Sequence, residues 1–269
     1  MGYALGLRRI AALALACALA ACSSVGNLRL PDVRHAPGLH YQRIENLPDS
    51  LVHVLRIDLQ DRSLQLMLSA KSERGLSVAQ MPSSMNALAS INASFFDRNF
   101  VPRGLTVSSG QAWRPVLAEQ NSPLLACDAQ NHCVIQLRPP FVRSPEWRNV
   151  VAGTPWLLDA GRQRSAADDA ECTALCAQAH PRSAVGLDAS GRYMYWVTAE
   201  GRRPPQVGLS LQQLSALMAG LGCHQAFNLD GGGSSTLWVD GQAVMARPFN
   251  EPALRKVANA LHLHTRTKP

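Results

Sequence analysis

The sequence predicts an α+β protein in which short strands outnumber helices, and three observations support this fold class. Apolar runs of strand length recur along the chain and are separated by turn residues such as Asp-Gly and Ser-Gly. One segment, 211–221, carries apolar residues at helical spacing. The length of 269 residues is enough for one large domain or two small ones.

The first 21 residues have the features of a secretory signal peptide. Two arginines precede an apolar run from Ile10 to Ala21, which is too short to remain as a membrane-spanning helix. Leu-Ala-Ala directly before Cys22 resembles a bacterial lipoprotein box. The resemblance implies a lipidated Cys22 and an anchor in the bacterial cell envelope. Because Ser23 and not Asp follows, we expect the outer membrane, facing the periplasm; the alternative is an ordinary signal peptide with an incidental cysteine.

Composition narrows the class of partner. Removing residues 1–21 takes away two arginines, so the formal charge falls from +7 to +5. Lys and Arg are scattered and form no basic helix or run, which argues against nucleic acid. A mildly positive net charge favours binding of anionic substrates or anionic envelope polymers. Nothing in the sequence indicates the oligomeric state.

Residues 22–48 are rich in Pro, Gly, Arg and His without periodicity, so we expect the lipidated cysteine to be followed by a loosely ordered tether. The folded domain is then expected over 49–269. Its first two strands are predicted at 51–59 and 64–68, joined by a turn at Asp61-Arg62.

The remaining elements follow from turn and helix signals. Segment 78–88 has weak helical spacing that Pro82 interrupts. The 211–221 helix has Ser210 as its expected N-cap and glycines at its end. Residues 165–179 are small and polar and form an expected insertion. Strand pairs are predicted at 104–107 with 111–113, 123–126 with 134–137, 182–188 with 193–198, and 236–239 with 243–245, and a last strand at 258–263.

The cysteines indicate disulfide bonds. Cys127 and Cys133 flank a predicted hairpin and can join its two strands, whereas Cys172 and Cys176 bracket three residues of the insertion. Cys223 is left as a buried thiol. The alternative is a zinc site, but the histidines that stand beside single cysteines do not give metal-ligand spacing. An oxidising compartment favours the disulfides.

The segment 226–238 carries the strongest functional signal. Asp230 stands where an apolar strand ends, and three glycines and three hydroxyl residues follow it. The glycines allow a positive φ, and their amides can form a nest for an anion. A carboxylate beside such amides suits a substrate with both a sugar and a phosphate. The alternative is a glycine-rich turn with a capping Asp. The absence of a following Gly-Lys-Ser/Thr argues against a Walker loop.

Two other polar residues lie near predicted strand ends. Arg182 begins a strand and would clamp a phosphate with two donors, although a surface arginine is the simpler interpretation. Asn92 ends a buried strand and would fix a substrate hydroxyl or amide; a turn-stabilising Asn is the alternative.

Four motifs follow one another along the chain: Asn92-Ala-Ser-Phe-Phe-Asp97, Pro102-Arg-Gly104-Leu105, Pro181-Arg-Ser-Ala-Val-Gly186 and Asn228-Leu-Asp-Gly-Gly-Gly-Ser-Ser-Thr236. In this order they resemble the phosphodiester glycosidase family over about 51–263. The family's first motif usually reads Asn-Gly-Gly-Phe-Phe, and here Ala93 and Ser94 replace the glycines. The resemblance implies one α+β domain on an extended mixed or antiparallel sheet, and a hydrolase that splits a sugar-1-phosphodiester such as that of N-acetylglucosamine.

The residues and the resemblance together give a mechanistic hypothesis. Arg182 and the glycine amides hold the phosphodiester, Asp230 acts as acid/base or orients water at the anomeric carbon, and Asn92 positions the substrate. The expected substrate-binding residues are Gly231, Gly232, Gly233, Ser234, Ser235, Asp97 and Asn228.

Three points stay open at this stage. Glycoside hydrolysis commonly needs two carboxylates, although a phosphate leaving group needs less protonation. If a second is required, Asp97, Glu119 and Asp188 are the candidates. A divalent metal at Asp230 is also compatible with the sequence. The second function hypothesis is an envelope lipoprotein that binds a glycan without turning it over.

Overall fold

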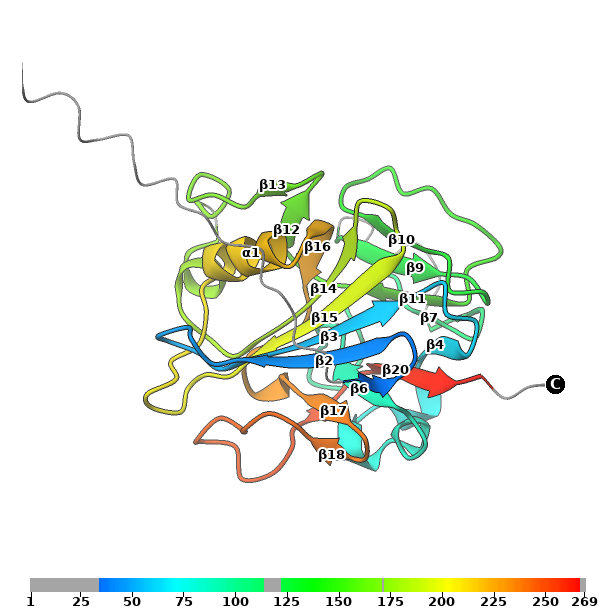
Figure 1. Cartoon of the computed structure of the whole chain (residues 1–269), viewed down its shortest axis with the longest axis horizontal. Helices are drawn as coiled ribbons and strands as arrows, with labels where there is room; N and C mark the ends of the chain where they lie inside the picture. Colours follow the sequence, from blue (N-terminus) through cyan, green and yellow to red (C-terminus); the bar gives the residue numbers. More distant parts are fainter. Residues whose placement is uncertain (1–33, 114–121, 171, 267–269) are drawn as a thin grey trace, which may run out of the picture.

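Antiparallel sheets carry most of the chain in the computed structural model, which describes residues 34–113, 122–170 and 172–266 (Figure 1). The largest sheet has eight strands. In spatial order these are β1 (Arg34–Ala36), β2 (Leu39–Ile44), β3 (Val52–Asp58), β15 (Tyr193–Ala199), β14 (Arg182–Asp188), β16 (Cys223–Asn228), β12 (Trp156–Asp159) and β13 (Arg162–Gln163).

The other strands form two five-stranded sheets and one isolated pair. One sheet contains β10 (Cys133–Gln136), β9 (Leu124–Cys127), β11 (Asn149–Ala152), β7 (Val107–Ser108) and β8 (Gln111–Ala112). The other contains β18 (Gln242–Ala243), β17 (Leu237–Val239), β6 (Ala89–Asn92), β20 (Ala260–Thr265) and β4 (Leu64–Leu68), and the pair is β19 (Lys256–Val257) with β5 (Leu76–Ser77).

The strand pairings of the described residues are all antiparallel, so the antiparallel alternative of the prediction is the correct one. The expected extended sheet corresponds to the eight-stranded one, and the other strands divide among smaller sheets that the sequence did not indicate. The chain is a single, mostly β domain with few helices.

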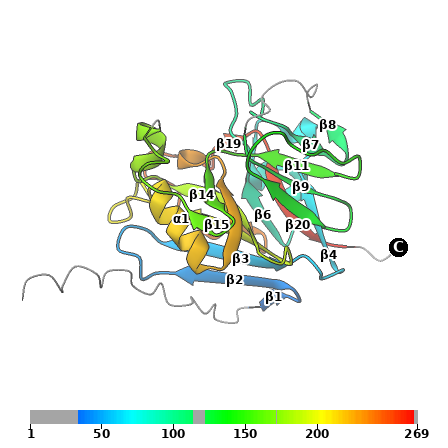
Figure 2. The same ribbon diagram turned by 90° about the horizontal axis from the view of Figure 1, so that it is seen from above.

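Both faces of the largest sheet are buried. Alternation along β15 sends Trp196 into one core cluster and Tyr195 and Val197 into another. The first cluster also contains Ile91 and Leu125 from the smaller sheets, whereas the second contains the apolar residues of α1 (Leu211–Gly220). Figure 2 shows α1 beside β14 and β15, with β7, β9 and β11 on the other side of the molecule.

The helix α1 begins and packs as predicted. The Ser210 hydroxyl accepts a 3.2 Å hydrogen bond from the Gln213 amide, and the Gln213 side chain accepts a 2.8 Å bond from the Ser210 amide. This reciprocal capping box satisfies two backbone donors at the helix start. Leu211, Leu214 and Met218 are fully buried against the sheet. None of the helices in the described ranges is long and apolar enough to cross a membrane.

Two predictions about the first half of the chain need correction. Part of the expected tether is ordered, because β2 pairs with β3 from Leu39 to Ile44 and Leu39 is fully buried. The weak helical segment 78–88 forms two short 3-10 turns, η2 (Val78–Gln80) and η3 (Pro82–Ser84), because Pro82 begins the second turn. The predicted signal peptide and Cys22 lie outside the described residues.

The remaining helical turns are short and lie between strands. They are η1 (Lys71–Glu73), η4 (Thr173–Ala177), which lies in the predicted insertion, and η5 (Gly232–Ser234), which lies in the glycine-rich motif. The Asp240-Gly241 turn joins β17 to β18 as predicted, with φ values of 47° and 78° that suit a tight hairpin.

Candidate active site

The glycine-rich segment 229–236 crosses between two sheets. It leaves β16 in the largest sheet and enters β17, which pairs with β6 in a smaller sheet. The Asp230 amide donates to the Ala93 carbonyl at 2.9 Å, and the Gly232 amide donates to the Pro181 carbonyl at 2.8 Å. These bonds attach the segment to the chain just beyond β6 and just before β14, so three motifs distant in sequence meet here.

Asn92 is the residue that joins these motifs. Its side-chain amide donates a 2.6 Å hydrogen bond to the Asp230 carbonyl, and its oxygen accepts from the Ser183 hydroxyl at 2.7 Å and from the Thr236 amide at 3.0 Å. The side chain is fully buried. Its carboxamide is therefore engaged within the protein, which supports a positioning role in place of the expected substrate contact.

The side chains that replace the family's usual glycines point away from open space. Ala93 and Ser94 are both 1% exposed. The Ser94 backbone amide donates a 2.9 Å hydrogen bond to Asn259 Oδ1, and Asn259 Nδ2 donates a 3.1 Å bond to the Ser94 hydroxyl. The two substitutions are absorbed by the packing around β6, so they add no side chain to the surface beside Asp230.

Asp230 has the properties of a functional carboxyl group. Burial raises its pKa to about 6, and hydrogen bonds from Ser234 and from the Gly231 amide, together with the charge of Arg255, oppose that rise. The Gly231 amide lies 3.0 Å from the Asp230 carboxylate. A carboxyl group with a pKa near the working pH can exchange a proton with a reacting group.

The predicted nest of glycine amides is only partly available to a ligand. The Gly231 amide donates to Asp230 and the Gly232 amide to Pro181. Gly232 has a φ of 61°, which favours glycine at this position. Conformation and close contact therefore explain these glycines better than the binding of an anion by three free amides.

Arg182 does not have the exposure expected of a phosphate clamp. Its side chain is 1% exposed, its Nε donates to the Leu209 carbonyl at 2.9 Å, and its Nη2 donates to the carbonyls of Leu175 and Gln178 at 2.6 and 2.8 Å. Burial, followed by the charge of Arg202, lowers its pKa to about 10, so it stays protonated at neutral pH. Arg182 is therefore a buried cation that holds the backbone around the site, and not the two-donor phosphate clamp that we expected.

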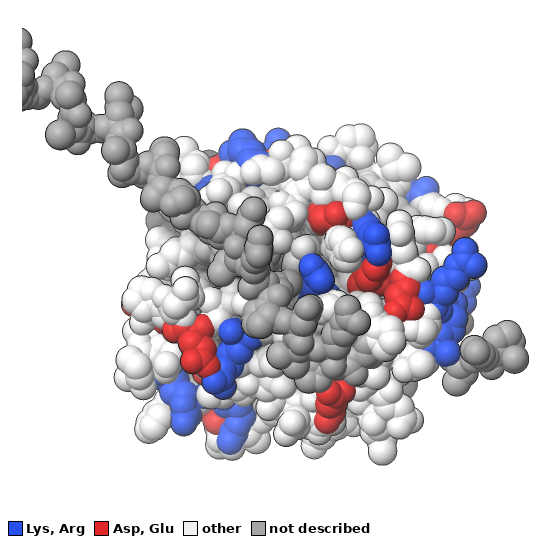
Figure 3. Space-filling view, in the orientation of Figure 1, with Lys and Arg blue, Asp and Glu red and all other residues white. Residues whose placement is uncertain are grey.

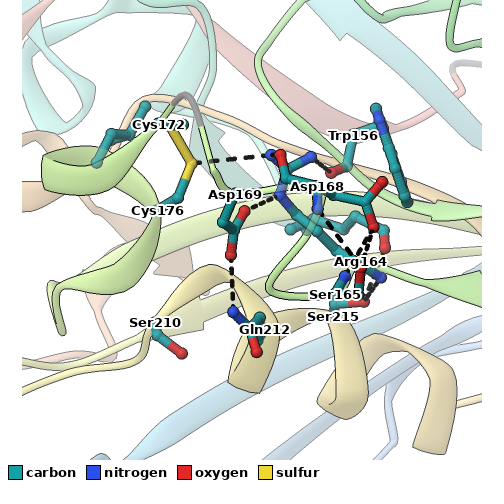
Figure 4. A network of polar contacts seen from close by, with 12 residues as sticks. Trp156, Arg164, Ser165, Asp168, Asp169, Cys172, Cys176, Ser210, Gln212 and Ser215 are labelled. Atoms are coloured by element: carbon teal, nitrogen blue, oxygen red, sulfur yellow. Dashed lines mark hydrogen bonds and ion pairs between the residues drawn. A yellow bond between two sulfur atoms is a disulfide. The ribbon is translucent and has the colours of Figure 1, made fainter.

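The insertion that supplies two of these carbonyls is itself fixed to α1 (Figure 4). Arg164 pairs with Asp169, and Asp169 accepts a 3.0 Å hydrogen bond from Gln212 of α1. The Arg164 amide donates to the Ser215 hydroxyl at 2.9 Å. The disulfide between Cys172 and Cys176 closes the segment. These contacts explain how a polar, small-residue segment presents ordered carbonyl groups to Arg182.

Three charged residues that the sequence reasoning missed surround the glycine-rich segment. An added Cβ at Gly232 would lie 3.1 Å from Arg202 Nη1, and one at Gly233 would collide with the paired side chains of Glu251 and Arg255. Arg202 also lies 3.2 Å from His180 Nδ1. The only sequence signals were an Arg-Arg pair after a predicted strand and a Glu–Arg spacing of four residues, both of which are common on protein surfaces.

Two substrate-binding candidates have buried polar atoms. Ser235 Oγ and Asn228 Oδ1 are buried without a hydrogen-bond partner in the described part of the chain. Asn228 Nδ2 donates to the Thr154 carbonyl at 2.8 Å, so this side chain also holds the loop before β12. Ser234 contacts Asp230 through its hydroxyl and is 1% exposed.

Two of the candidates for a second carboxylate cap turns. Asp97 accepts hydrogen bonds from the amides of Asn99 and Val101 at 2.9 Å and caps a turn. Asp188 caps the hairpin at the opposite end of β14 from Arg182. Glu119 lies outside the described residues. Glu251, beside Gly233, is the carboxylate that the described structure places here.

Both predicted disulfides are confirmed. Cys127 is joined to Cys133 across β9 and β10, and Cys172 is joined to Cys176. Cys223 is free and buried, as expected, and burial raises the pKa of its thiol. Among residues 34–113, 122–170 and 172–266, no group of three or more His, Cys, Asp or Glu side chains is arranged to hold a metal ion.

Known proteins resemble this chain in sequence and in fold. The family model described as phosphodiester glycosidase matches residues 85–264, which include every motif around Asp230. A curated protein of Bacillus subtilis strain 168, the SPbeta prophage-derived uncharacterized protein YomE, is 27% identical over 173 residues. That match covers 62% of this chain and 26% of YomE, so the chain spans about a quarter of that relative's length.

Solved structures show the same fold. The catalytic domain of zebrafish N-acetylglucosamine-1-phosphodiester alpha-N-acetylglucosaminidase, auto-inhibited by its pro-peptide, aligns with a TM-score of 0.69 and 19% identity over 86% of this chain and 85% of that one. A hypothetical protein from Synechocystis aligns with a TM-score of 0.67 and 17% identity, over 85% of this chain and 62% of its own. A putative exported protein from Burkholderia pseudomallei K96243 aligns with a TM-score of 0.54 and 18% identity, over 80% of this chain and 74% of its own.

Proposed function

The chain belongs to the phosphodiester glycosidase family, and from this we propose that it is a hydrolase that cleaves sugar-1-phosphodiesters. In this reaction water attacks the anomeric carbon and the bond from that carbon to the phosphate oxygen breaks. The products are the free sugar and a phosphomonoester on the leaving group. The single observation that carries the proposal is the Asp230 carboxyl, with a pKa of about 6, in a segment surrounded by Arg202 and Arg255.

Asp230 acts on water in this proposal. At neutral pH most of a carboxyl group with a pKa of about 6 is ionised, so it is able to accept a proton from the attacking water. The phosphate leaving group needs little protonation, which removes the need for a strong general acid. Asn92 fixes the backbone of Asp230 through its 2.6 Å bond and so sets where the carboxylate stands.

Arg202 and Arg255 take the phosphate-binding role that the sequence assigned to Arg182. Both are exposed, and both lie beside the glycine-rich segment, whereas Arg182 is buried on carbonyl groups. Guanidinium groups bind phosphate through charge-assisted hydrogen bonds that keep their geometry. Glu251 orients Arg255 through their ion pair and, because it lies against Gly233, is the second carboxylate of this mechanism.

The cellular setting of this activity is part of the proposal. The lipoprotein-like start supports a protein anchored through Cys22 in the bacterial envelope, where sugar-phosphate polymers would be its substrates. Mass spectrometry of the mature N-terminus tests this: we expect diacylglycerol on Cys22 and none on the Cys22→Ser variant. An unmodified residue other than Cys22 at that terminus would contradict the anchor.

The activity is tested with soluble protein that begins at Ser24 and a panel of sugar-1-phosphodiesters, of which N-acetylglucosamine-1-phosphodiesters are the first choice. We expect release of free sugar together with a phosphomonoester. Release of a sugar-1-phosphate would show cleavage on the other side of the phosphorus and contradict the proposal. Binding of a glycan without turnover would favour the binding-lipoprotein alternative.

A further inference from the structure

A cleft of about 600 Å³ opens beside the candidate active site. Its walls come from the segment after β18 and from the chain after β15, and they include Arg203, Met245, Arg247, Phe249 and Glu251. None of these residues is part of the sequence motifs that led to Asp230. Of these residues, only Glu251 has a role in the mechanism proposed above.

The cleft is continuous with the active site through Glu251. This residue lines the cleft, and its carboxylate lies against Gly233 in the glycine-rich segment. The Phe249 amide donates a 3.1 Å hydrogen bond to the carbonyl of Arg202, which is the second arginine beside that segment. If the phosphate of a ligand lies between Arg202 and Arg255, the leaving group attached to that phosphate would reach the cleft.

The walls of the cleft are fixed by hydrogen bonds. The Ala246 amide donates to the buried carboxylate of Glu200 at 2.8 Å, and Arg247 Nη1 donates to the Glu251 carbonyl at 2.9 Å. Glu200 in turn lies 2.9 Å from Nε2 of the fully buried His53 in β3. The segment is thus attached to the largest sheet, which favours a formed binding surface over a loose loop.

The chemistry of the lining fits an anionic glycan. Arg203 and Arg247 are both exposed, and Glu251, which is the carboxylate of the lining, is already paired with Arg255. The cleft therefore presents uncompensated positive charge. Phe249 is 82% exposed and offers a flat apolar surface for the C–H face of a sugar ring. A purely apolar leaving group would gain nothing from the two guanidinium groups.

We propose that this cleft binds the leaving-group side of the substrate, and that the preferred leaving group is a glycan that carries a second phosphodiester. The substrate class is then an oligomer or polymer of sugar phosphates and not an isolated sugar-1-phosphodiester. This inference rests on the proposed function, because it assumes that the anomeric carbon lies at Asp230.

The test compares two synthetic substrates with the same sugar, one with a single phosphodiester and one with a second phosphodiester on its leaving group. We expect wild type to show at least about tenfold higher kcat/KM for the second substrate, since a charge-assisted contact to phosphate contributes that much. In the Arg203→Gln, Arg247→Gln double variant the ratio of the two kcat/KM values should fall to about one, mainly through KM. Arg192→Gln is the matched control. Arg192 lies in the β14–β15 hairpin and is paired with Asp58 of β3, so this variant should keep the wild-type ratio.

The outcomes separate this inference from the proposed function. Equal kcat/KM for both substrates in wild type, or an unchanged ratio in the double variant, overturns the cleft assignment while hydrolysis itself stands. If wild type cleaves neither substrate, the Kd for the substrate with two phosphodiesters tests the cleft assignment instead. An equal Kd for wild type and the double variant overturns the assignment. Weaker binding by the double variant supports it. A preference for a leaving group with a long alkyl chain over the second phosphodiester also overturns it.

Discussion

The side-chain amide of Asn92 donates a 2.6 Å hydrogen bond to the backbone carbonyl of Asp230, although the two residues are 138 positions apart in the sequence. Asn92 ends β6 in one sheet and Asp230 follows β16 in another. The carboxyl group that we place at the centre of the mechanism is therefore held by a buried residue that does not face a substrate.

The Asn92→Ala variant should lose both stability and turnover. The substitution leaves the Asp230 carbonyl, the Thr236 amide and the Ser183 hydroxyl without their partner, which costs about 2–4 kcal/mol of unfolding free energy. A displaced Asp230 should lower kcat about 10- to 100-fold and leave KM nearly unchanged. Urea unfolding and steady-state kinetics measure the two effects.

Asn149→Ala is the matched control for this variant. Asn149 is also buried, and its carboxamide holds β4 through bonds of 3.0 Å to the Leu68 amide and 3.1 Å to the Leu66 carbonyl. It should lose stability to a similar extent and keep kcat. A kcat for Asn92→Ala no lower than that of Asn149→Ala would contradict the positioning role.

The Asp230→Asn variant should be more stable than wild type at neutral pH. Burial raises the pKa of Asp230 from 3.8 to about 6, so the folded protein binds this proton more tightly than the unfolded chain. Wild type therefore loses stability as pH rises from about 4 to about 6, by up to about 3 kcal/mol. Asn does not titrate, so the difference between variant and wild type should be small at pH 4 and largest above pH 6.5.

Urea unfolding of both proteins across this pH range checks that expectation. Equal pH dependence of the two unfolding free energies would mean that burial does not penalise the Asp230 carboxylate. A carboxyl group kept at a cost in stability is typical of functional sites.

Arg202 and Arg182 should respond differently to substitution. Arg202→Gln removes an exposed guanidinium beside the glycine-rich segment and should raise KM about tenfold or more with little change in stability. Arg182→Gln leaves the carbonyls of Leu209, Leu175 and Gln178 without their donor and should destabilise the fold. Kinetics together with thermal unfolding distinguish the two. A raised KM without loss of stability in Arg182→Gln would restore the direct phosphate clamp.

The cysteines give a prediction that is independent of activity. Soluble protein that begins at Ser24 should contain one thiol, Cys223, which reacts with a labelling reagent only after unfolding because it is buried and burial raises its pKa. Peptide mapping without reduction should recover Cys127–Cys133 and Cys172–Cys176, each contributing about 2 kcal/mol. A cross-link to Cys223, or rapid labelling in the native protein, would contradict this arrangement.

Local signals predicted the elements well, because each rests on neighbouring residues. The hairpins around Ser190-Gly191 and Asp240-Gly241, the Ser210 cap and both disulfides follow from turn chemistry and spacing within a few positions. The sequence could not predict the division into several sheets, because pairings such as β6 with β20 join segments far apart in the chain.

The site was predicted in part for the same reason. Asp230 and its glycines form one continuous motif, whereas Arg202, Glu251 and Arg255 reach them only through the tertiary fold. The sequence assigned Arg182 to phosphate because an arginine at a strand end can point either way. Burial among backbone carbonyls, which decides its role, is visible only in the folded chain. Acidic and basic side chains are interspersed on the face that Figure 3 shows.

Turnover by Asp230→Asn tests the central claim most directly, with release of free sugar from an N-acetylglucosamine-1-phosphodiester as the measured quantity. Asn keeps the shape and hydrogen-bonding oxygen of Asp230 but cannot accept the proton from water, so kcat should fall about 10²- to 10⁴-fold. Wild-type kcat/KM should rise with pH through about 6 as the carboxyl ionises. The matched control is Asp240→Asn in the β17–β18 turn, where Asn-Gly suits the same hairpin geometry, and it should keep wild-type turnover. Hydrolysis by Asp230→Asn at the wild-type rate, with the same pH profile, would contradict the account.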